Sequence, residues 1–342
     1  TQTITTLGFK MGGYRLAILT ILIWITPATL LMSGIVLGYS WMQDHELLAI
    51  FKFIPAMAVG FLFAAAFKML PLIKKHWGFY SIAIVAMFLV VLNQIYARNA
   101  FTSSIILPTI LLAAAFISQK FIDIKFTPNK TPVGKIKVRQ LLVIAAIFLV
   151  IVIVGNAFKI KEVLLFENTF RMGSLVFGGG QVLVPMLEAQ YVHTTARLTA
   201  TEFANGYGFL QAVPGPVFSF STYVNGMALQ DKGPWFQLLG CLIGSIGIFL
   251  PGLLIMFFVY PIWDRVKQYP IVQRALNGIV AAAVGLVFAA AILIFMSLLQ
   301  SGSLQKGFGM EIIVLLATFF LVAFTKLPSP LVVVLTVLVG LV

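Results

Sequence analysis

Charged side chains are scarce in this sequence: Asp, Glu, Lys and Arg make up 10% of its 342 residues, while 61% are hydrophobic. A soluble domain carries roughly a quarter charged residues, so the polarity needed for a water-facing surface is missing. The apolar residues fall in runs close to the ~20 residues that cross a bilayer core. The composition therefore predicts an all-α, polytopic membrane protein embedded in the lipid bilayer.

Cysteine and histidine are nearly absent. The one cysteine, Cys241, excludes an internal disulfide and any metal site built from several cysteines. The three histidines (His45, His76 and His193) lie far apart in the sequence, near predicted loops, which argues against a metal held by histidines. We expect neither a bound metal nor a cofactor.

The net charge of +13 comes from Lys and Arg in short loops between the apolar runs. No basic face and no pattern of basic and aromatic residues indicates a nucleic-acid partner. Lys and Arg are typical of the cytoplasmic loops of membrane proteins. The charge therefore reports orientation in the membrane rather than a polyanionic partner.

The apolar runs define the expected spans. A basic linker at 119–140 interrupts them, and its Pro128 and Pro132 disfavour a regular helix there. A second interruption, from 163 to 227, is rich in glycine, proline and scattered charges. The runs lie at about 14–40, 47–67, 79–97, 100–118, 141–158, 235–260, 275–299, 312–324 and 329–342.

Two stretches of the sequence are nearly the same. Residues 58–67 read AVGFLFAAAF, residues 283–292 read AVGLVFAAAI, and seven of the ten positions are identical. The glycine of each copy follows a mid-span proline, by 33 residues after Pro27 and by 34 after Pro251. We interpret the copies as parts of two homologous repeats, 1–118 and 159–342.

Loops in equivalent positions of the two repeats differ in charge. The loop at 43–46 is acidic, whereas its counterpart at 265–274 is basic. Under the positive-inside rule the repeats then lie in the membrane in opposite senses, with the linker 119–140 in the cytoplasm and helix 141–158 reversing the topology. Secondary transporters are commonly built from such inverted repeats, with binding sites near the midplane where helices are broken.

The interrupted segment contains Gly178-Gly179-Gly180 and Pro214-Gly215-Pro216. These are kinks or tight helix crossings, or they are breaks that line a cavity, because non-helical backbone cannot face lipid. As breaks they predict short helices over 181–192 and 217–227, whose free N–H groups and positive dipole ends suit an anion. The candidate binding residues are Gly178, Gly179, Gly180, Gln181, Glu202, Gln211, Pro214, Gly215, Pro216 and Ser219.

Several charged residues in this segment have two interpretations. An ionised carboxylate at the centre of a membrane helix costs about 2.5–3.5 kcal/mol, so Glu202 is either a proton carrier or anion gate, or simply the cap of a short helix. Arg171 either attracts the anion or pairs with Glu167 one turn earlier. Arg197 and His193 are expected in a solvated loop.

The order and spacing of these residues carry a family resemblance. The segment resembles the second-half signature of the chromate ion transporter family at Phe177-Gly178-Gly179-Gly180-Gln181, Pro185, Glu202-Phe203, Gly206-Tyr207, Gln211 and Pro214-Gly215-Pro216. The resemblance implies antiparallel homologous halves, a place in the cell membrane, and export of chromate, an analogue of sulfate. The first half of such proteins usually has its own Phe-Gly-Gly and Pro-Gly-Pro elements, and residues 1–9 (TQTITTLGF) resemble the stretch after the latter. We therefore expect roughly 60 residues ahead of Thr1, holding the other half of the site.

These observations predict secondary active transport of an oxyanion, chromate or a sulfate-like dianion, bound at the N-termini of broken helices. A passive anion channel on the same architecture is the alternative, because both use helix-end anion sites. Coupling to a proton and exchange with a counter-anion are both open, and a homodimer is compatible with the sequence. An enzyme is disfavoured, because Ser219 and Ser221 have no histidine nearby in the sequence.

Overall fold

A computed structural model describes residues 2–44, 47–96, 100–121, 160–176, 180–266, 269–300 and 308–341, together with isolated positions between 146 and 157. Apart from residues 119–121, the predicted linker 119–140 lies outside these residues, as does most of the predicted helix 141–158. Within the described ranges every regular element is a helix, which confirms the all-α prediction.

The first half of the chain forms four helices that match the predicted spans. Short 3-10 turns at Leu47–Phe51 and Leu70–Leu72 separate α1 from α2 and α2 from α3, and a third at Ser118–Lys120 follows α4. The helices are α1 (Gln2–Asp44), α2 (Ile54–Met69), α3 (Trp77–Tyr96) and α4 (Ala100–Ile117).

Helix α1 is broken near its start. Gly12 (φ −148°, ψ 23°) and Gly13 (φ 65°, ψ −154°) leave the helical conformation, and the positive φ of Gly13 is one that glycine adopts without strain. The segment before the break folds back on the rest, since a Cβ at Gly8 would lie 2.6 Å from Thr20 Oγ1. The long span therefore begins at residue 14, as predicted, and a short helical segment precedes it.

The interrupted segment forms short helical pieces. Residues 189–194 are a π-helix rather than an α-helix. The pieces are α6 (Lys161–Leu175), η4 (Gly180–Val182), α7 (Leu183–Glu188), η5 (Ala189–Thr194), α8 (Ala200–Leu210), η6 (Val217–Ser219), α9 (Phe220–Met227) and η7 (Gln230–Lys232). The predicted short helices at 181–192 and 217–227 are both present.

Four further helices follow: α10 (Pro234–Val266), α11 (Pro270–Gln300), α12 (Phe308–Phe324) and α13 (Ser329–Gly340). Five helical stretches among the described residues are long and apolar enough to cross a membrane: Thr3–Gln43, Ala49–Leu72, Trp77–Tyr96, Pro234–Phe257 and Pro270–Gln300. Helix α3 carries an exposed aromatic residue at each end, Trp77 and Tyr96. Its 20 residues span roughly 30 Å, which matches the thickness of a bilayer's hydrocarbon core, and aromatic residues are enriched at membrane interfaces.

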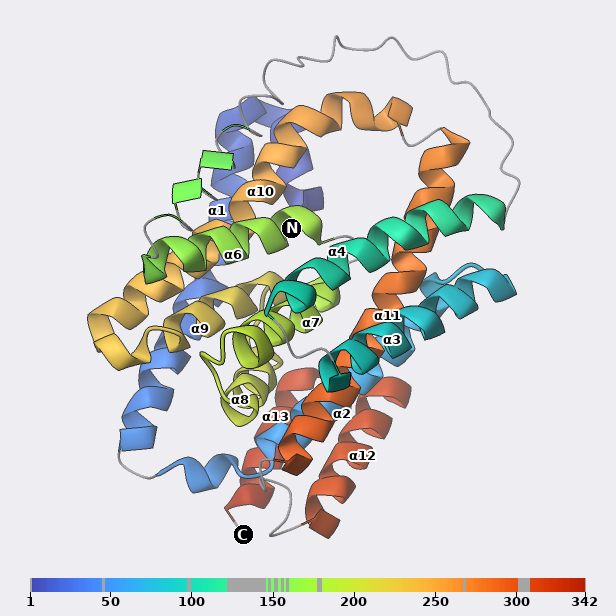
Figure 1. Cartoon of the computed structure of the whole chain (residues 1–342). Coiled ribbons are helices and arrows are strands. Elements are labelled where there is room, and N and C mark those ends of the chain that lie inside the picture. The colour runs from blue at the N-terminus through green and yellow to red at the C-terminus, as the bar shows by residue number, and fades with distance from the viewer. Residues whose placement is uncertain are drawn as a thin grey trace.

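The long helices pack through small residues. Figure 1 shows α2, α3, α11 and α12 grouped together, with α11 beside α3. A Cβ at Gly60 on α2 would lie 2.6 Å from the carbonyl oxygen of Leu315 on α12, and a Cβ at Gly285 on α11 would overlap the carbonyl oxygen of Ala83 on α3. Close backbone approach of this kind is how helices associate in lipid, where burial of apolar surface gives little driving force between them.

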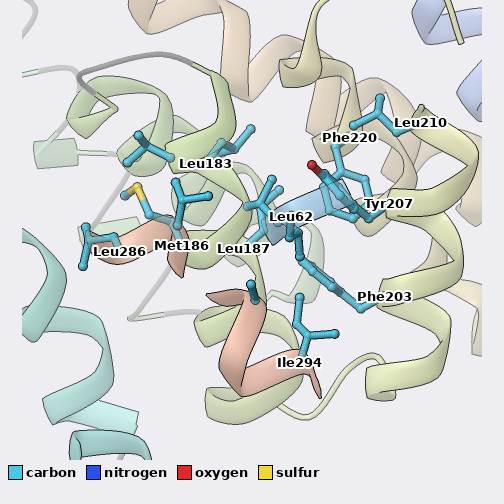
Figure 2. Close-up of a cluster of buried hydrophobic side chains, with 14 of the residues drawn as sticks. Leu62, Leu183, Met186, Leu187, Phe203, Tyr207, Leu210, Phe220, Leu286 and Ile294 are labelled. Atoms are coloured by element: carbon cyan, nitrogen blue, oxygen red, sulfur yellow. The ribbon is translucent and has the colours of Figure 1, made fainter. Parts of the chain in front are cut away.

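The short helices are held by a shared apolar core, shown in Figure 2. Tyr207 on α8 and Phe220 on α9 pack ring to ring, with centroids 5.8 Å apart. Buried side chains from α2, α7 and α11 complete the cluster: Leu62, Leu183, Met186, Leu187, Leu286 and Ile294. The core fixes the interrupted segment against the long helices, so its breaks are held in defined positions.

Candidate functional site

Two helical hairpins make up the interrupted segment, and they enter the protein from one end. At this entry end two ion pairs join the start of α6 to η7: Lys161 to Asp231 at 2.9 Å and Lys232 to Glu162 at 2.6 Å. Farther along, a Cβ at Gly173 of α6 would lie 2.6 Å from the carbonyl oxygen of Ile248 on α10. Helix α6 therefore runs inward alongside α10.

The first hairpin returns to the entry end through α7 and η5. The hydroxyl of Tyr191 on η5 donates to Asn225 Oδ1 at 3.0 Å, and Asn225 lies near the end of α9, just before η7. The second hairpin consists of α8, which runs inward, and α9, which returns. Their antiparallel pairing is fixed by Tyr223, whose hydroxyl donates to the carbonyl oxygen of Glu202 at 3.0 Å.

The turns of both hairpins lie near the middle of the long helices. Gly215 packs against Ala28, since a Cβ at Gly215 would lie 2.5 Å from that of Ala28, halfway along the straight part of α1. Gly173, close to the turn of the first hairpin, packs against Ile248 near the centre of α10. The 11 residues of α8 span about 16 Å, half of the ~30 Å hydrocarbon thickness. Gly173 and Gly215 therefore lie level with the middle of α10 and α1.

The two turns are in contact. A Cβ at Gly180 would lie 3.0 Å from the Cβ of Val217 and 3.5 Å from a ring carbon of Phe218. Gly180 is thus the point where the first hairpin touches the start of η6 in the second. Gly178 and Gly179 lie outside the described residues.

The Pro214-Gly215-Pro216 turn ends one helix and starts another. Gly215 has φ 151°, a conformation that residues with a Cβ rarely adopt. Pro216 is extended (φ −74°, ψ 141°) and serves as the N-cap of η6. The first backbone bond of the new turn runs from Ser219 N to Pro216 O, 2.9 Å, so the amides of Val217 and Phe218 precede it. Pro214 and Gly215 are exposed.

Two glutamine side chains lie at the ends of the short helices. Gln181, in the first turn after Gly180, accepts a hydrogen bond from the Tyr207 hydroxyl at 3.0 Å. Gln211 is the C-cap of α8, and its buried Nε2 makes no hydrogen bond of ideal geometry among the described residues, although its side chain lies close to the Tyr207 hydroxyl. An unpaired buried amide donor is costly, and an anion is one group that would satisfy it.

The Ser219 hydroxyl braces the turn. Ser219 is fully buried, and its Oγ donates to the carbonyl oxygen of Pro216 at 2.8 Å. Ser221 likewise donates to the carbonyl oxygens of Phe218 and Gly244, both at 2.9 Å. The proton of Ser219 is therefore already engaged in stabilising the helix start.

Glu202 lies at the other end of α8 from the turn. Its carboxylate accepts from Thr199 N at 2.7 Å and Thr199 Oγ1 at 2.9 Å, while Glu202 N donates to Thr199 Oγ1 at 3.1 Å. Gln230 Nε2 donates to the second carboxylate oxygen at 3.1 Å. This is a reciprocal capping box. The capping interaction is present, and Glu202 lies at the opposite end of α8 from Gln211, nine residues or roughly 13 Å along the helix.

The remaining charged residues are paired locally or buried. Arg171 donates to Glu167 Oε1 at 2.9 Å, so the alternative of a pair one turn away is confirmed. The expectation that His193 and Arg197 lie in a solvated loop holds only in part: Arg197 lies in the loop between η5 and α8 but is half-buried, and His193 belongs to η5. His193 Nε2 lies 2.5 Å from Oε1 of the buried Glu188, and Arg197 Nη1 is itself buried. The Glu188–His193 spacing of five residues does not join side chains in an α-helix, so the sequence pattern gave no signal of it; the π-helix η5 brings them together.

Comparison with known proteins decides the family. The sequence model described as chromate transporter matches residues 1–119 and 163–341, most of the chain. The chain belongs to the chromate transporter family. It is accordingly a multi-pass membrane protein of a family of transporters rather than enzymes.

Individual relatives of this chromate transporter family member are more distant. An uncharacterized transporter of Methanocaldococcus jannaschii is 27% identical over 180 residues, 53% of this chain and 41% of that protein. The chromate transport protein of Pseudomonas aeruginosa is 27% identical over 129 residues, 38% of this chain and 29% of that protein. A probable chromate transport protein of Synechococcus elongatus is 24% identical over 172 residues, 50% of this chain and 41% of that protein. The matches thus span less than half the length of these relatives, and no solved structure matches the chain.

Proposed function

We propose that the protein is a secondary active transporter that moves a tetrahedral oxyanion such as chromate out of the cytoplasm, and that the anion binds where the two hairpin turns meet. The observation that carries the proposal is the contact of Gly180 with Val217. Two relatives whose printed names are chromate transport protein and probable chromate transport protein support the choice of anion.

The chemistry of the turns supports an anionic guest. The amides of Val217 and Phe218 stand at a helix start, where the free N–H groups and the helix dipole favour negative charge. The unpaired Nε2 of Gln211 adds a side-chain donor at the end of α8. Each hydrogen bond to a charged group contributes about 1.5–3 kcal/mol, so a few such donors suffice for reversible binding.

The lack of side chains at the glycines supports the same site. Gly180 and Gly215 leave backbone uncovered on both hairpins, and the Cβ of a larger residue at either position would collide with its neighbour. Gly178 and Gly179, which precede this contact in the sequence, belong to the proposed site although they lie outside the described residues. Pro214 and Pro216 set the turn, and the Ser219 hydroxyl stabilises it.

We also propose that the two halves are inverted repeats. Gly60 and Gly285 occupy the same position in the two matching stretches, and each packs on a backbone carbonyl of the third helix of the other half, at Leu315 and Ala83. The paired prolines of the two halves lie in the middle of α1 and α10. Opposed halves provide the two alternating conformations that a carrier needs. The basic linker 119–140 is then cytoplasmic and the protein resides in the cell membrane.

Flux into proteoliposomes tests the proposal. Purified protein reconstituted in liposomes should take up labelled chromate with saturable kinetics, and excess sulfate should compete. Turnover far above ~10³ per second would indicate the channel alternative instead of a carrier. Absence of saturable flux with both chromate and sulfate would reject this substrate class.

A further inference from the structure

A buried acid and a histidine form a pair away from the hairpin turns. Glu188, the last residue of α7, is 1% exposed, and its Oε1 lies 2.5 Å from Nε2 of His193 on η5. The His193 side chain is 13% exposed, so this member of the pair reaches toward water. The second carboxylate oxygen of Glu188 is buried and has no hydrogen-bond partner among the described residues. Burying such a carboxylate costs free energy, and ionisable residues inside membrane proteins usually have a function.

The π-helix η5 brings Glu188 and His193 together. Helix α7 gives way to η5 at Ala189, and the wider turn of residues 189–194 sets His193 beside Glu188 across five positions. Single-turn π segments are rare inside helices and are found mostly at functional sites. A regular helix here would place the two side chains on different faces.

A small cavity adjoins the carboxylate. It has a volume of about 10 Å³, close to the room that one water molecule requires. Its polar lining comes from Glu188 together with Asn93 and Gln94 of α3. The rest is apolar and belongs to α3, α4, α7, η5 and α11: Val90, Ile106, Leu107, Pro185, Ala189, Ala290 and Leu293.

Few other charged side chains lie around the pair in the described part of the chain. Among described residues, the linings from α3, α4 and α11 are uncharged. From α6, Glu167 and Arg171 are bonded to each other, and Arg197 follows η5 with a buried, unpaired Nη1.

We propose that Glu188 and His193 form the coupling-proton site of the transporter. The proton binds between Glu188 Oε1 and His193 Nε2, and the net charge of the pair changes from −1 to 0. The site rests on the proposed function for its role in transport, and it takes a proton rather than a metal ion, since it has one carboxylate and one imidazole. The segment from η4 through α7 connects the proton site to the proposed anion site. Gly180 and Gln181 lie at its start, and Glu188 lies eight residues after Gly180, roughly 12 Å away. An anion at the turn therefore favours the protonated pair through electrostatics and through the shared helix.

Direct measurement of proton binding tests the site without any flux. Chromate is added to purified protein in weakly buffered, mildly alkaline solution, where chromate is a dianion, and the pH is followed with an indicator. The wild-type protein should take up about one proton per anion bound, because the two ligands stabilise each other. The Glu188→Gln variant should bind chromate and take up none. Equal proton uptake by wild type and Glu188→Gln would overturn the proposal, as would chromate binding to the wild type without uptake.

Transport in proteoliposomes separates this proposal from the proposed function. With Glu188→Gln, chromate–chromate exchange should stay within about twofold of wild type, while acceleration by a pH gradient is lost. The matched control is Glu162→Gln at the exposed pair with Lys232, which should keep the full response to the gradient. His193→Gln, a second variant, should lose the response as well. If wild-type exchange does not respond to a pH gradient but responds to a sodium gradient, the proton site alone is refuted. If none of the proteins shows exchange, the proposed function is refuted.

Discussion

Gly180 lies directly against Val217: a Cβ at Gly180 would come within 3.0 Å of the Val217 Cβ, so two separate hairpins touch at this point. Through this contact, the two interrupted stretches of the sequence meet at one position in the structure. It also makes that place sensitive to a single methyl group, because the neighbouring atom belongs to a branched side chain on a rigid turn.

Glycine substitutions at the turns should reduce transport. Gly215→Ala adds a Cβ that would lie 2.5 Å from the Ala28 Cβ and forces φ 151° on a residue with a side chain. We expect chromate flux to be lost and the melting temperature to fall, with a strain of about 1–3 kcal/mol. Gly34→Ala and Gly38→Ala on α1 are the matched controls, since nothing lies within 4 Å of a Cβ there. Flux by Gly215→Ala equal to that of the controls would contradict a role for this turn.

Gln211 should affect affinity without stabilising the fold. The Gln211→Leu change removes the unpaired Nε2 donor, so the melting temperature should stay constant or rise. The KM for chromate should increase by roughly tenfold, which corresponds to one lost bond of about 1.4 kcal/mol. Gln181→Leu provides the contrast, because it removes the acceptor of the Tyr207 hydroxyl and should lower stability. A lower melting temperature for Gln211→Leu with normal KM would show that the amide is structural.

The capping box separates the two original interpretations of Glu202. Thr199→Ala should destabilise the protein by about 1 kcal/mol, because it removes the N-cap hydroxyl. Glu202→Gln keeps a side chain that also completes a capping box, so stability and transport should both be largely retained. Thermal melting and flux measure the two effects. Loss of transport in Glu202→Gln with an intact melting temperature would restore the carboxylate as a gate or proton carrier.

The proposed orientation predicts which loops face the outside. Lys74, in the exposed loop after α2, should be cytoplasmic, and Asp231 in η7 should be external. Lys74→Cys and Asp231→Cys, made one at a time, should therefore differ in labelling of intact cells by an impermeant thiol reagent. The native Cys241 is 1% exposed and serves as the silent background. Labelling of Lys74→Cys but not Asp231→Cys would invert the topology, and labelling of both would refute the arrangement.

The ion pairs at the entry end predict an acid-sensitive contribution to stability. The hydrogen bond from Lys232 lowers the pKa of Glu162, and that from Lys161 lowers the pKa of Asp231. A lowered folded-state pKa contributes stability that is present above the unfolded value of about 4 and is lost as the pH falls through the folded value. The Lys161→Gln/Lys232→Gln double variant should melt slightly below wild type at neutral pH, and the difference should vanish in acid. A difference that grows in acid would contradict this assignment.

Residues that locally start or end helices made much of the fold predictable from sequence. The spans follow from apolar runs, and the short helices after Gly180 and Pro216 follow from residues whose own backbone preferences end one helix and start another. The contact between Gly180 and Val217 could not be read in this way, because it depends on two hairpins folding to the same depth. The two-repeat organisation stays a proposal.

The errors have physical causes as well. The Glu188–His193 pair depends on a π-helix, and no side-chain period distinguishes one π turn from an α turn. The cap role of Glu202 is one of the two interpretations that the sequence offers, and the structure adds its partner, Thr199. Packing, rather than local preference, buries the Nη1 of Arg197 although the residue lies in a loop.

The most direct test of the account is a structure of the protein determined with chromate or molybdate bound. Density for a tetrahedral anion should lie beside Gly180 and Val217, within hydrogen-bonding reach of the Val217 and Phe218 amides. Density at another place in a protein that transports the anion, with the two turns empty, would contradict the claim that helices end inside the bilayer to hold it.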